Sequence, residues 1–162
     1  MSAGNIQFLD MAQFGSIGSR KYAVAAGTTS SINPGEPVAK ALGAPTVSAT
    51  ATNTPVVATD FLAGISTTTS TETANAAGSV EVMPMIPGVV YLIAPKVAAT
   101  WDTQAEYDAL VGDRVLFDLT SGVYTILATD NAANGLVVEP LDINIYPGKV
   151  AFTIRAAVAY NA

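Results

Sequence analysis

The sequence contains neither cysteine nor histidine. Without histidine there is no Ser-His-Asp or Cys-His triad, no imidazole proton shuttle and no histidine-ligated zinc site. Without cysteine there is no thiolate nucleophile, disulfide, iron–sulfur cluster or cysteine zinc finger. Catalysis would have to come from carboxylates, hydroxyls, lysine, arginine or an oxygen-ligated metal. Because those remaining residues give only the weak signals described below, we expect a protein that is not an enzyme and uses no cofactor.

Charged side chains are also scarce, at 12% of the residues, whereas an ordinary soluble domain has about a quarter. Seven are basic and 13 are acidic, which gives a net charge of -6. Such a chain is repelled by a phosphate backbone and by anionic lipid. We expect neither nucleic acid nor a membrane as a direct partner. With half of the residues hydrophobic, the composition favours a surface partly covered in an assembly, or a robust protein exposed to the outside.

No stretch reaches the roughly 18 apolar residues of a membrane span. The first residues, MSAGN, lack the basic region and long apolar run of a secretory signal. We therefore expect a protein made in a cytoplasm that stays there or leaves as part of something larger. Its 162 residues suit one domain, alone or with an arm.

The N-terminal segment 1–27 is rich in apolar side chains that follow neither a helical nor a strand period. One interpretation is a short helix capped by Asn5. The other is an extended arm that docks apolar side chains onto a neighbour, so that removing residues 2–19 would barely change the melting temperature. We divide the chain into an arm at 1–27 and a β-rich domain at 28–162. The candidate partner contacts of the arm are Ile6, Phe8, Leu9, Met11 and Phe14.

The remaining sequence predicts mainly β structure. Residues 28–77 are rich in threonine, serine and alanine and carry only weak strand patterns, at 38–42, 54–58 and 61–65, whereas apolar runs become frequent from residue 79. Segments 115–119 and 123–127 flank a short connection containing glycine and predict a hairpin. Segment 149–160 alternates apolar and other residues with a period of two, as a half-buried strand does. We expect a compact β-barrel or β-sandwich-like domain.

One short helix is expected near 103–111. Thr103 and Glu106 have the spacing of a capping box, and Gly112 suits the residue after a helix. Proline followed by glycine occurs at 34–35, 87–88 and 147–148. Each pair predicts a type II turn, because proline presets the first central residue and glycine accepts the positive φ of the second.

The chemistry-bearing residues give weak signals. Asp102 and Glu106 are four residues apart and could share a helix face as an acid/base pair or a calcium site, but a solvated, capped helix explains them equally well. Segment 128–135 has turn residues without the acidic ladder of a calcium loop, and predicts a hairpin loop. Trp101, the lone tryptophan, is either a core residue or a subunit-contact anchor. We assign no catalytic, cofactor or metal site.

Several blocks of sequence, in order, resemble the small decoration, or cement, proteins of tailed bacteriophage capsids. They are 33–38 (NPGEPV), 61–65 (FLAGI), 78–82 (GSVEV), 111–115 (VGDRV) and 122–125 (GVYT). None is a unique signature. The resemblance depends on their order and on a cysteine-free composition rich in alanine, threonine and glycine.

The resemblance implies a compact β-rich protein, made in the host cytoplasm, that binds the exterior of the mature capsid in the virion. Its partner would be the major capsid protein, whose subunits it would clamp together, often as a homotrimer at local three-fold positions. An N-terminal arm would add a strand to a capsid sheet edge. The alternatives are a shell, tail or fibre protein of the virion, or a carbohydrate-binding β domain.

Overall fold

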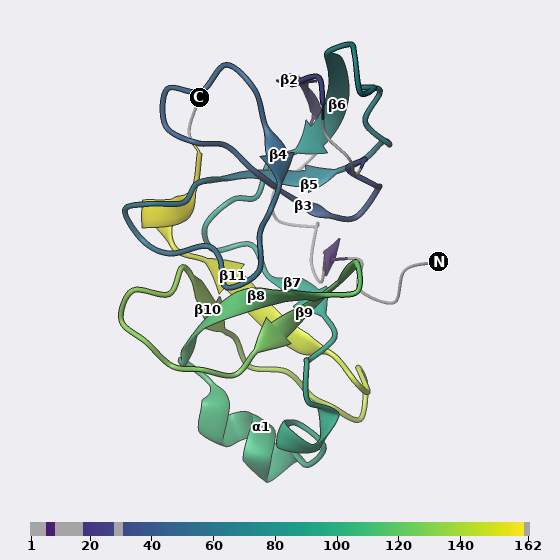
Figure 1. Ribbon diagram of the computed structural model, residues 1–162. Helices are drawn as coiled ribbons and strands as arrows, with labels where there is room; N and C mark the ends of the chain where they lie inside the picture. The colour runs from purple at the N-terminus through teal and green to yellow at the C-terminus, as the bar shows by residue number, and fades with distance from the viewer. Residues whose placement is uncertain (1–5, 9–17, 28–30, 161–162) are drawn as a thin grey trace.

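The computed structural model describes residues 6–8, 18–27 and 31–160. It is mainly β, with two curled antiparallel sheets and one α-helix at the far end of the larger sheet (Figure 1), which confirms the expected fold class. The six-stranded sheet has the order β1 (Gln7–Phe8), β7 (Tyr91–Ile93), β11 (Val150–Ile154), β10 (Leu136–Val138), β8 (Arg114–Thr120) and β9 (Val123–Leu127). The five-stranded sheet has the order β2 (Arg20–Val24), β6 (Gly78–Met83), β5 (Leu62–Ser66), β3 (Pro37–Ala39) and β4 (Ser48–Ala49).

Each sheet curls until a parallel bridge joins distant strands: the residues after β7 meet β9 in the larger sheet, and β2 meets the residue before β4 in the smaller one. In the larger sheet the Ile126 amide donates to the Ala94 carbonyl at 3.0 Å, and the Lys96 amide donates to the Ile126 carbonyl at 2.9 Å. In the smaller sheet the Val47 amide, just before β4, donates to the Ala23 carbonyl of β2 at 2.9 Å. These bridges pair part of the backbone that would otherwise be exposed at the sheet edges.

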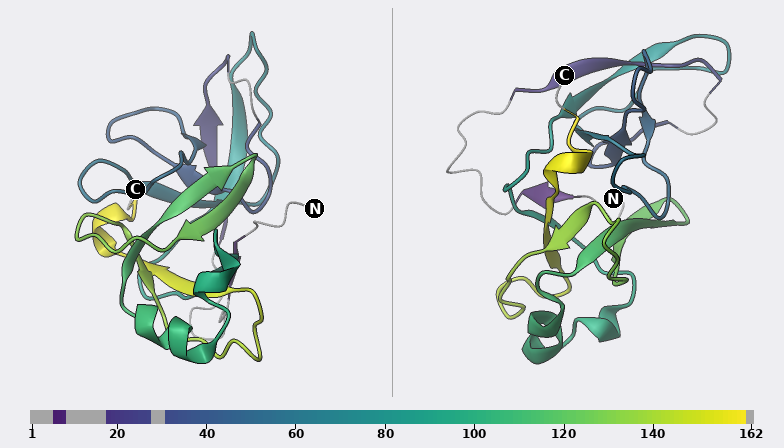
Figure 2. Two further views of the ribbon diagram at one scale, coloured as in Figure 1. Left: turned by 60° about the horizontal axis from the view of Figure 1, so that its bottom comes forward. Right: turned by 90° about the vertical axis from the view of Figure 1, so that its left-hand side faces the viewer.

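Strand β5 of the smaller sheet packs against both cores, and all five of its residues are buried. Leu62 and Ile65 pack into the larger core, whereas Ala63 packs into the smaller one. The larger core is centred on aromatic side chains: the rings of Phe117 and Phe152 are edge to face, with centroids 5.5 Å apart. The smaller core consists mainly of valines. Because one strand serves both cores, the sheets form one folded unit (Figure 2).

Part of the segment assigned to the arm belongs to this unit. Ile6 is buried in the larger core, and β1 pairs with β7 at the sheet edge through two registered pairs. Extended backbone at Gln7–Phe8 does not fit a helix starting at Asn5. Residues 20–24 form β2, which pairs with β6 over five registered pairs and buries Val24 completely. Leu9, Met11 and Phe14 lie outside the described residues.

The structure confirms the elements that were predicted from local capping and turn residues. The hairpin β8–β9 turns through Ser121 (φ 52°) and Gly122 (φ 77°), both with the positive φ that a two-residue hairpin turn favours. The helix α1 spans Gln104–Leu110 with both bonds of the capping box present. The glycines of the three Pro-Gly pairs have φ values of 87°, 86° and 66° at Gly35, Gly88 and Gly148.

Three expectations need correction. The C-terminal strand β11 ends at Ile154, because its partner β10 begins opposite at Leu136, and the one-turn 3-10 helix η2 (Ala156–Val158) follows. Segment 54–58 makes only isolated bridges. Loop 128–135 does not close a hairpin, since β9 and β10 each pair with β8 and not with each other. Within the described ranges, no helix has the length and apolar character that a membrane crossing requires.

Candidate functional site

The end of the molecule around α1 gathers most of the sequence features that could carry chemistry. Thr103 caps the helix: its Oγ1 accepts from the Glu106 amide at 3.3 Å, and its own amide donates to Glu106 Oε2 at 3.2 Å. Tyr107 anchors the helix from the inside. Its hydroxyl donates to the Glu139 carbonyl at 3.0 Å and accepts from the Ala151 amide at 2.8 Å. A helix of only seven residues is stable here because tertiary contacts hold it.

Gln104 joins the helix to the loop between β10 and β11. Its Nε2 donates to the Leu141 carbonyl at 2.9 Å and to Asp108 Oδ1 at 2.7 Å. Its Oε1 accepts from the Ile143 amide at 3.1 Å. Two of the three hydrogen bonds of the side-chain amide therefore position segment 141–143 against the helix. The residues around Gln104 carry no local signal for this role, because its partners in segment 141–143 lie 37 and 39 residues away.

Two hollows adjoin this contact. The first has a volume of about 180 Å³, and its lining residues are Pro95, Ala98, Trp101, Asp102, Ile143, Pro147 and Gly148. The second is wider and shallower, with a volume of about 450 Å³, and its lining residues are Gln104, Asp108, Pro140, Leu141, Asp142 and Asn144. The first hollow is mainly apolar, and the second carries two aspartates.

Trp101 is a core residue that also lines the first hollow. Only 5% of it is exposed, and its ring meets Tyr107 edge to face with centroids 5.5 Å apart. An edge-to-face pair of this kind contributes about 0.5–1.5 kcal/mol beyond area burial. Of the two roles considered for Trp101, the structure therefore supports the core residue. A partner could touch Trp101 only by entering the first hollow.

Asp102 and Glu106 are within hydrogen-bonding distance of each other at the surface. The neighbouring Glu106 carboxylate raises the pKa of Asp102. The hydrogen bond from Thr103 and then that from Asp102 lower the pKa of Glu106. The catalytic carboxyls of glycosidases are about 5–9.5 Å apart, which leaves space for the sugar and water. Two carboxyls in direct contact do not fit that geometry.

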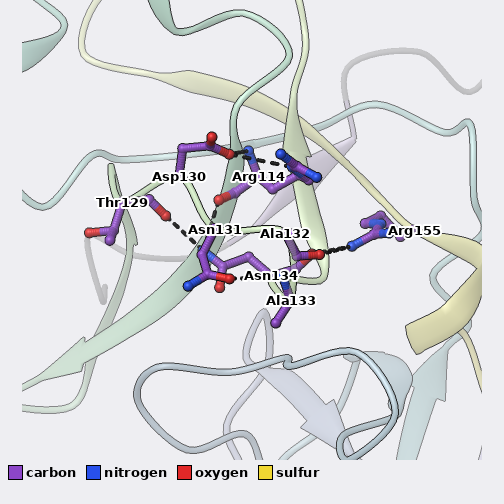
Figure 3. Close-up of polar contacts among 8 residues, drawn as sticks. All are labelled: Arg114, Thr129, Asp130, Asn131, Ala132, Ala133, Asn134 and Arg155. Atoms are coloured by element: carbon purple, nitrogen blue, oxygen red, sulfur yellow. Dashed lines mark hydrogen bonds and ion pairs between the residues drawn. The ribbon is translucent and has the colours of Figure 1, made fainter.

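Loop 128–135, considered above for calcium, has its oxygens occupied by protein donors (Figure 3). Asp130 Oδ1 accepts from the Arg114 amide at 2.9 Å and from Arg114 Nε at 3.4 Å. The buried Asn134 donates to the carbonyls of Arg114 and Thr129 at 2.8 and 2.7 Å. Arg155 Nη1 donates to the carbonyls of Ala132 and Asn134 at 2.8 and 2.9 Å. Arg114 and Arg155 therefore brace the loop. The loop oxygens that a cation would need accept hydrogen bonds from these arginines instead.

Among the residues that the structure describes, no group of three or more acidic side chains is placed to hold a metal ion. Comparison with known proteins adds no relative: no family model, curated protein or solved structure matches this chain. The function must therefore be inferred from the residues and the geometry of the chain itself.

Proposed function

We propose that the protein is a structural component of tailed-phage virions that binds the capsid exterior and stabilises contacts between major capsid subunits. Support comes first from the ordered blocks that resemble capsid decoration proteins. In the fold, these blocks lie at turns and strands of both sheets: 33–38 leads into β3, 61–65 covers most of β5, and 78–82 starts β6. A charged content of only 12% also favours a protein whose surface is covered by neighbours.

The observation that carries the proposal is the way residues 6–8 lie on the edge of the larger sheet. β1 is held by two registered pairs with β7, and the Ile6 amide donates to the Gly35 carbonyl at 3.3 Å. Strand addition of this kind takes its affinity from backbone hydrogen bonds and its register from a buried side chain. Because β1 has only two residues paired with β7, it can leave β7 and pair with the sheet edge of a capsid subunit instead. The net cost in free energy of this exchange is small. Leu9, Met11 and Phe14 would then extend the apolar contact.

Binding should depend on apolar burial and only weakly on salt, because the acidic chain offers a capsid little Coulombic attraction. Many equivalent capsid sites would make weak single contacts sufficient. A homotrimer at local three-fold positions is part of the proposal, since three arms on one body increase the effective concentration of each.

The test is cosedimentation of purified protein with expanded capsids that lack it. We expect saturable binding that changes little between low and high salt. Deleting residues 2–8, or substituting Ile6→Asp, should weaken binding by at least about tenfold, whereas Leu42→Asp, an 80% exposed position, should not. The variants are compared below their melting temperatures. Wild-type protein that does not bind capsids contradicts the proposal, and tubes or lattices formed without capsids would favour a shell, tail or fibre protein.

A further inference from the structure

The first hollow beside α1 has apolar side chains exposed next to both of its walls. Val97, 54% exposed, lies in the chain between the lining residues Pro95 and Ala98. Ile145, 66% exposed, lies between the lining residues Ile143 and Pro147. We call residues 95–102, Glu106 and 141–148 the α1 pole, which comes forward in the left view of Figure 2. Exposed aliphatic side chains beside an apolar hollow are typical of surfaces that bind a partner.

The size of the hollow limits what can occupy it. Pockets for free small molecules usually measure about 300–1,000 Å³, and this one measures about 180 Å³. That volume suits one aliphatic side chain inserted from outside, in contact with the buried Trp101 of the lining. A side chain held on a partner's backbone would also bring other partner atoms to Val97 and Ile145, the exposed apolar residues next to the lining residues in the chain.

The charge at the mouth indicates what should accompany that side chain. Asp102 lines the hollow and contacts Glu106, and neither makes an ion pair with any described residue. Lys96, the nearest lysine in sequence, is engaged by Asp118 at 2.7 Å. Asp108 and Asp142 line the adjoining second hollow. A cation brought by a partner would offset the repulsion within the carboxyl pair and add a charge-assisted hydrogen bond.

We propose that the α1 pole docks a protein segment in which one aliphatic side chain stands next to lysine or arginine. The aliphatic side chain fills the hollow above Trp101, and the cation pairs with Asp102 and Glu106. This interface lies at the opposite end of the larger sheet from the smaller sheet, and it needs neither the N-terminal segment nor a capsid.

The test uses full-length protein and a synthetic peptide, acetyl-Gly-Leu-Lys-Lys-Gly-amide. Because the chain has one tryptophan, Trp101 fluorescence and its indole N–H resonance report on the hollow directly. We expect saturable shifts at Trp101 and at the backbone amides of 96–102, 143–146 and 148. Peptides with serine for leucine, or glutamate for both lysines, should bind at least about tenfold more weakly.

Variants separate the two parts of the interaction. Asp102→Asn with Glu106→Gln, which keeps a capping residue at 106, should remove the preference for lysine over glutamate peptides, whereas Glu81→Gln on the other sheet should not. Val97→Ser with Ile145→Ser should weaken binding, whereas Leu42→Ser should not. The proposal is overturned by shifts that do not saturate, by shifts centred elsewhere, or by equal binding of the lysine and glutamate peptides.

Discussion

The hydroxyl of Tyr124 donates a 2.6 Å hydrogen bond to the carbonyl oxygen of Thr50, in the buried space between the two sheets. Tyr124 belongs to β9 of the larger sheet, and Thr50 follows β4 of the smaller one. Beyond Thr50 the chain runs along β8, where the amides of Asn53 and Phe117 donate to the carbonyls of Phe117 and Thr54 at 2.8 and 2.7 Å. Segment 50–54 is therefore a strap that joins the sheets.

Removing the Tyr124 hydroxyl should loosen this strap. We expect Tyr124→Phe to lower the free energy of unfolding by about 1–3 kcal/mol, because it leaves a buried carbonyl without a donor. For a chain of this length that corresponds to a melting temperature lower by about 2–4 °C per kcal/mol. Tyr146→Phe, at a half-exposed position, should change stability by less than about 0.5 kcal/mol. Urea unfolding measures both, and equal effects would contradict the strap.

Asp118 should matter more than the other paired carboxylate. It accepts from Lys96 Nζ and Thr120 Oγ1, each at 2.7 Å. The Lys96 hydrogen bond lowers its pKa from the ordinary 3.8. We expect Asp118→Asn to cost about 1–3 kcal/mol at neutral pH. Asp130→Asn removes an exposed pair with Arg114 and should cost less than about 1 kcal/mol.

The pH dependence of the Asp118 effect has a definite sign. Because folding lowers the pKa of Asp118, the ionised side chain stabilises the fold at pH values above its ordinary pKa of 3.8. This contribution is lost as the pH falls below that value and the carboxylate is protonated. The stability difference between wild type and Asp118→Asn should therefore be constant from pH 7 to about 5 and shrink below about 4. Urea titrations across that range measure it. A difference that grows on acidification would show that another group dominates.

The elements that the sequence predicted correctly are those whose partners are close in the chain. The capping box joins Thr103 to Glu106, and the β8–β9 turn needs only Ser121 and Gly122 to accept a positive φ. Such interactions are determined within a few residues, so periodicity and turn chemistry are enough to find them.

The features that the sequence did not predict depend on distant partners. β2 is a strand because β6 lies beside it, and its pattern of largely exposed residues carries no clear period. Trp101 could have faced a partner or the core, and its contact with Tyr107 placed it in the core. Gln104 positions segment 141–143 through hydrogen bonds that leave no trace in the local sequence. The apolar and acidic character of the α1 pole therefore emerges only after folding.

Gly64 in β5 should tolerate no side chain. Its φ is 153°, and a Cβ built on it would lie 2.0 Å from the Met83 carbonyl oxygen of β6. We expect Gly64→Ala to lower the free energy of unfolding by more than about 3 kcal/mol or to prevent folding, because the backbones of β5 and β6 must move apart. Gly88→Ala is the matched control: its φ is 86° but nothing lies within 4 Å, so it should cost only about 1–2 kcal/mol. Similar thermal stability of the two variants would show that β5 and β6 are farther apart.

Buried tyrosines should make the fold sensitive to alkali. Burial raises the pKa of Tyr91 and Tyr107 from 10.0 to about 12, and it raises the pKa of Tyr124 as well. Because these phenols ionise more readily in the unfolded chain, their contribution to stability is complete below pH 10.0 and is lost as pH rises towards 12.

Each can lower the free energy of unfolding by up to about 1.4 kcal/mol per pH unit in that window. Urea unfolding between pH 9 and about 11.5 should show the free energy of unfolding falling with pH. Tyr107→Phe should make this fall less steep by about the contribution of one tyrosine. Ultraviolet titration of the folded protein that shows every phenol ionising near pH 10 would contradict the prediction.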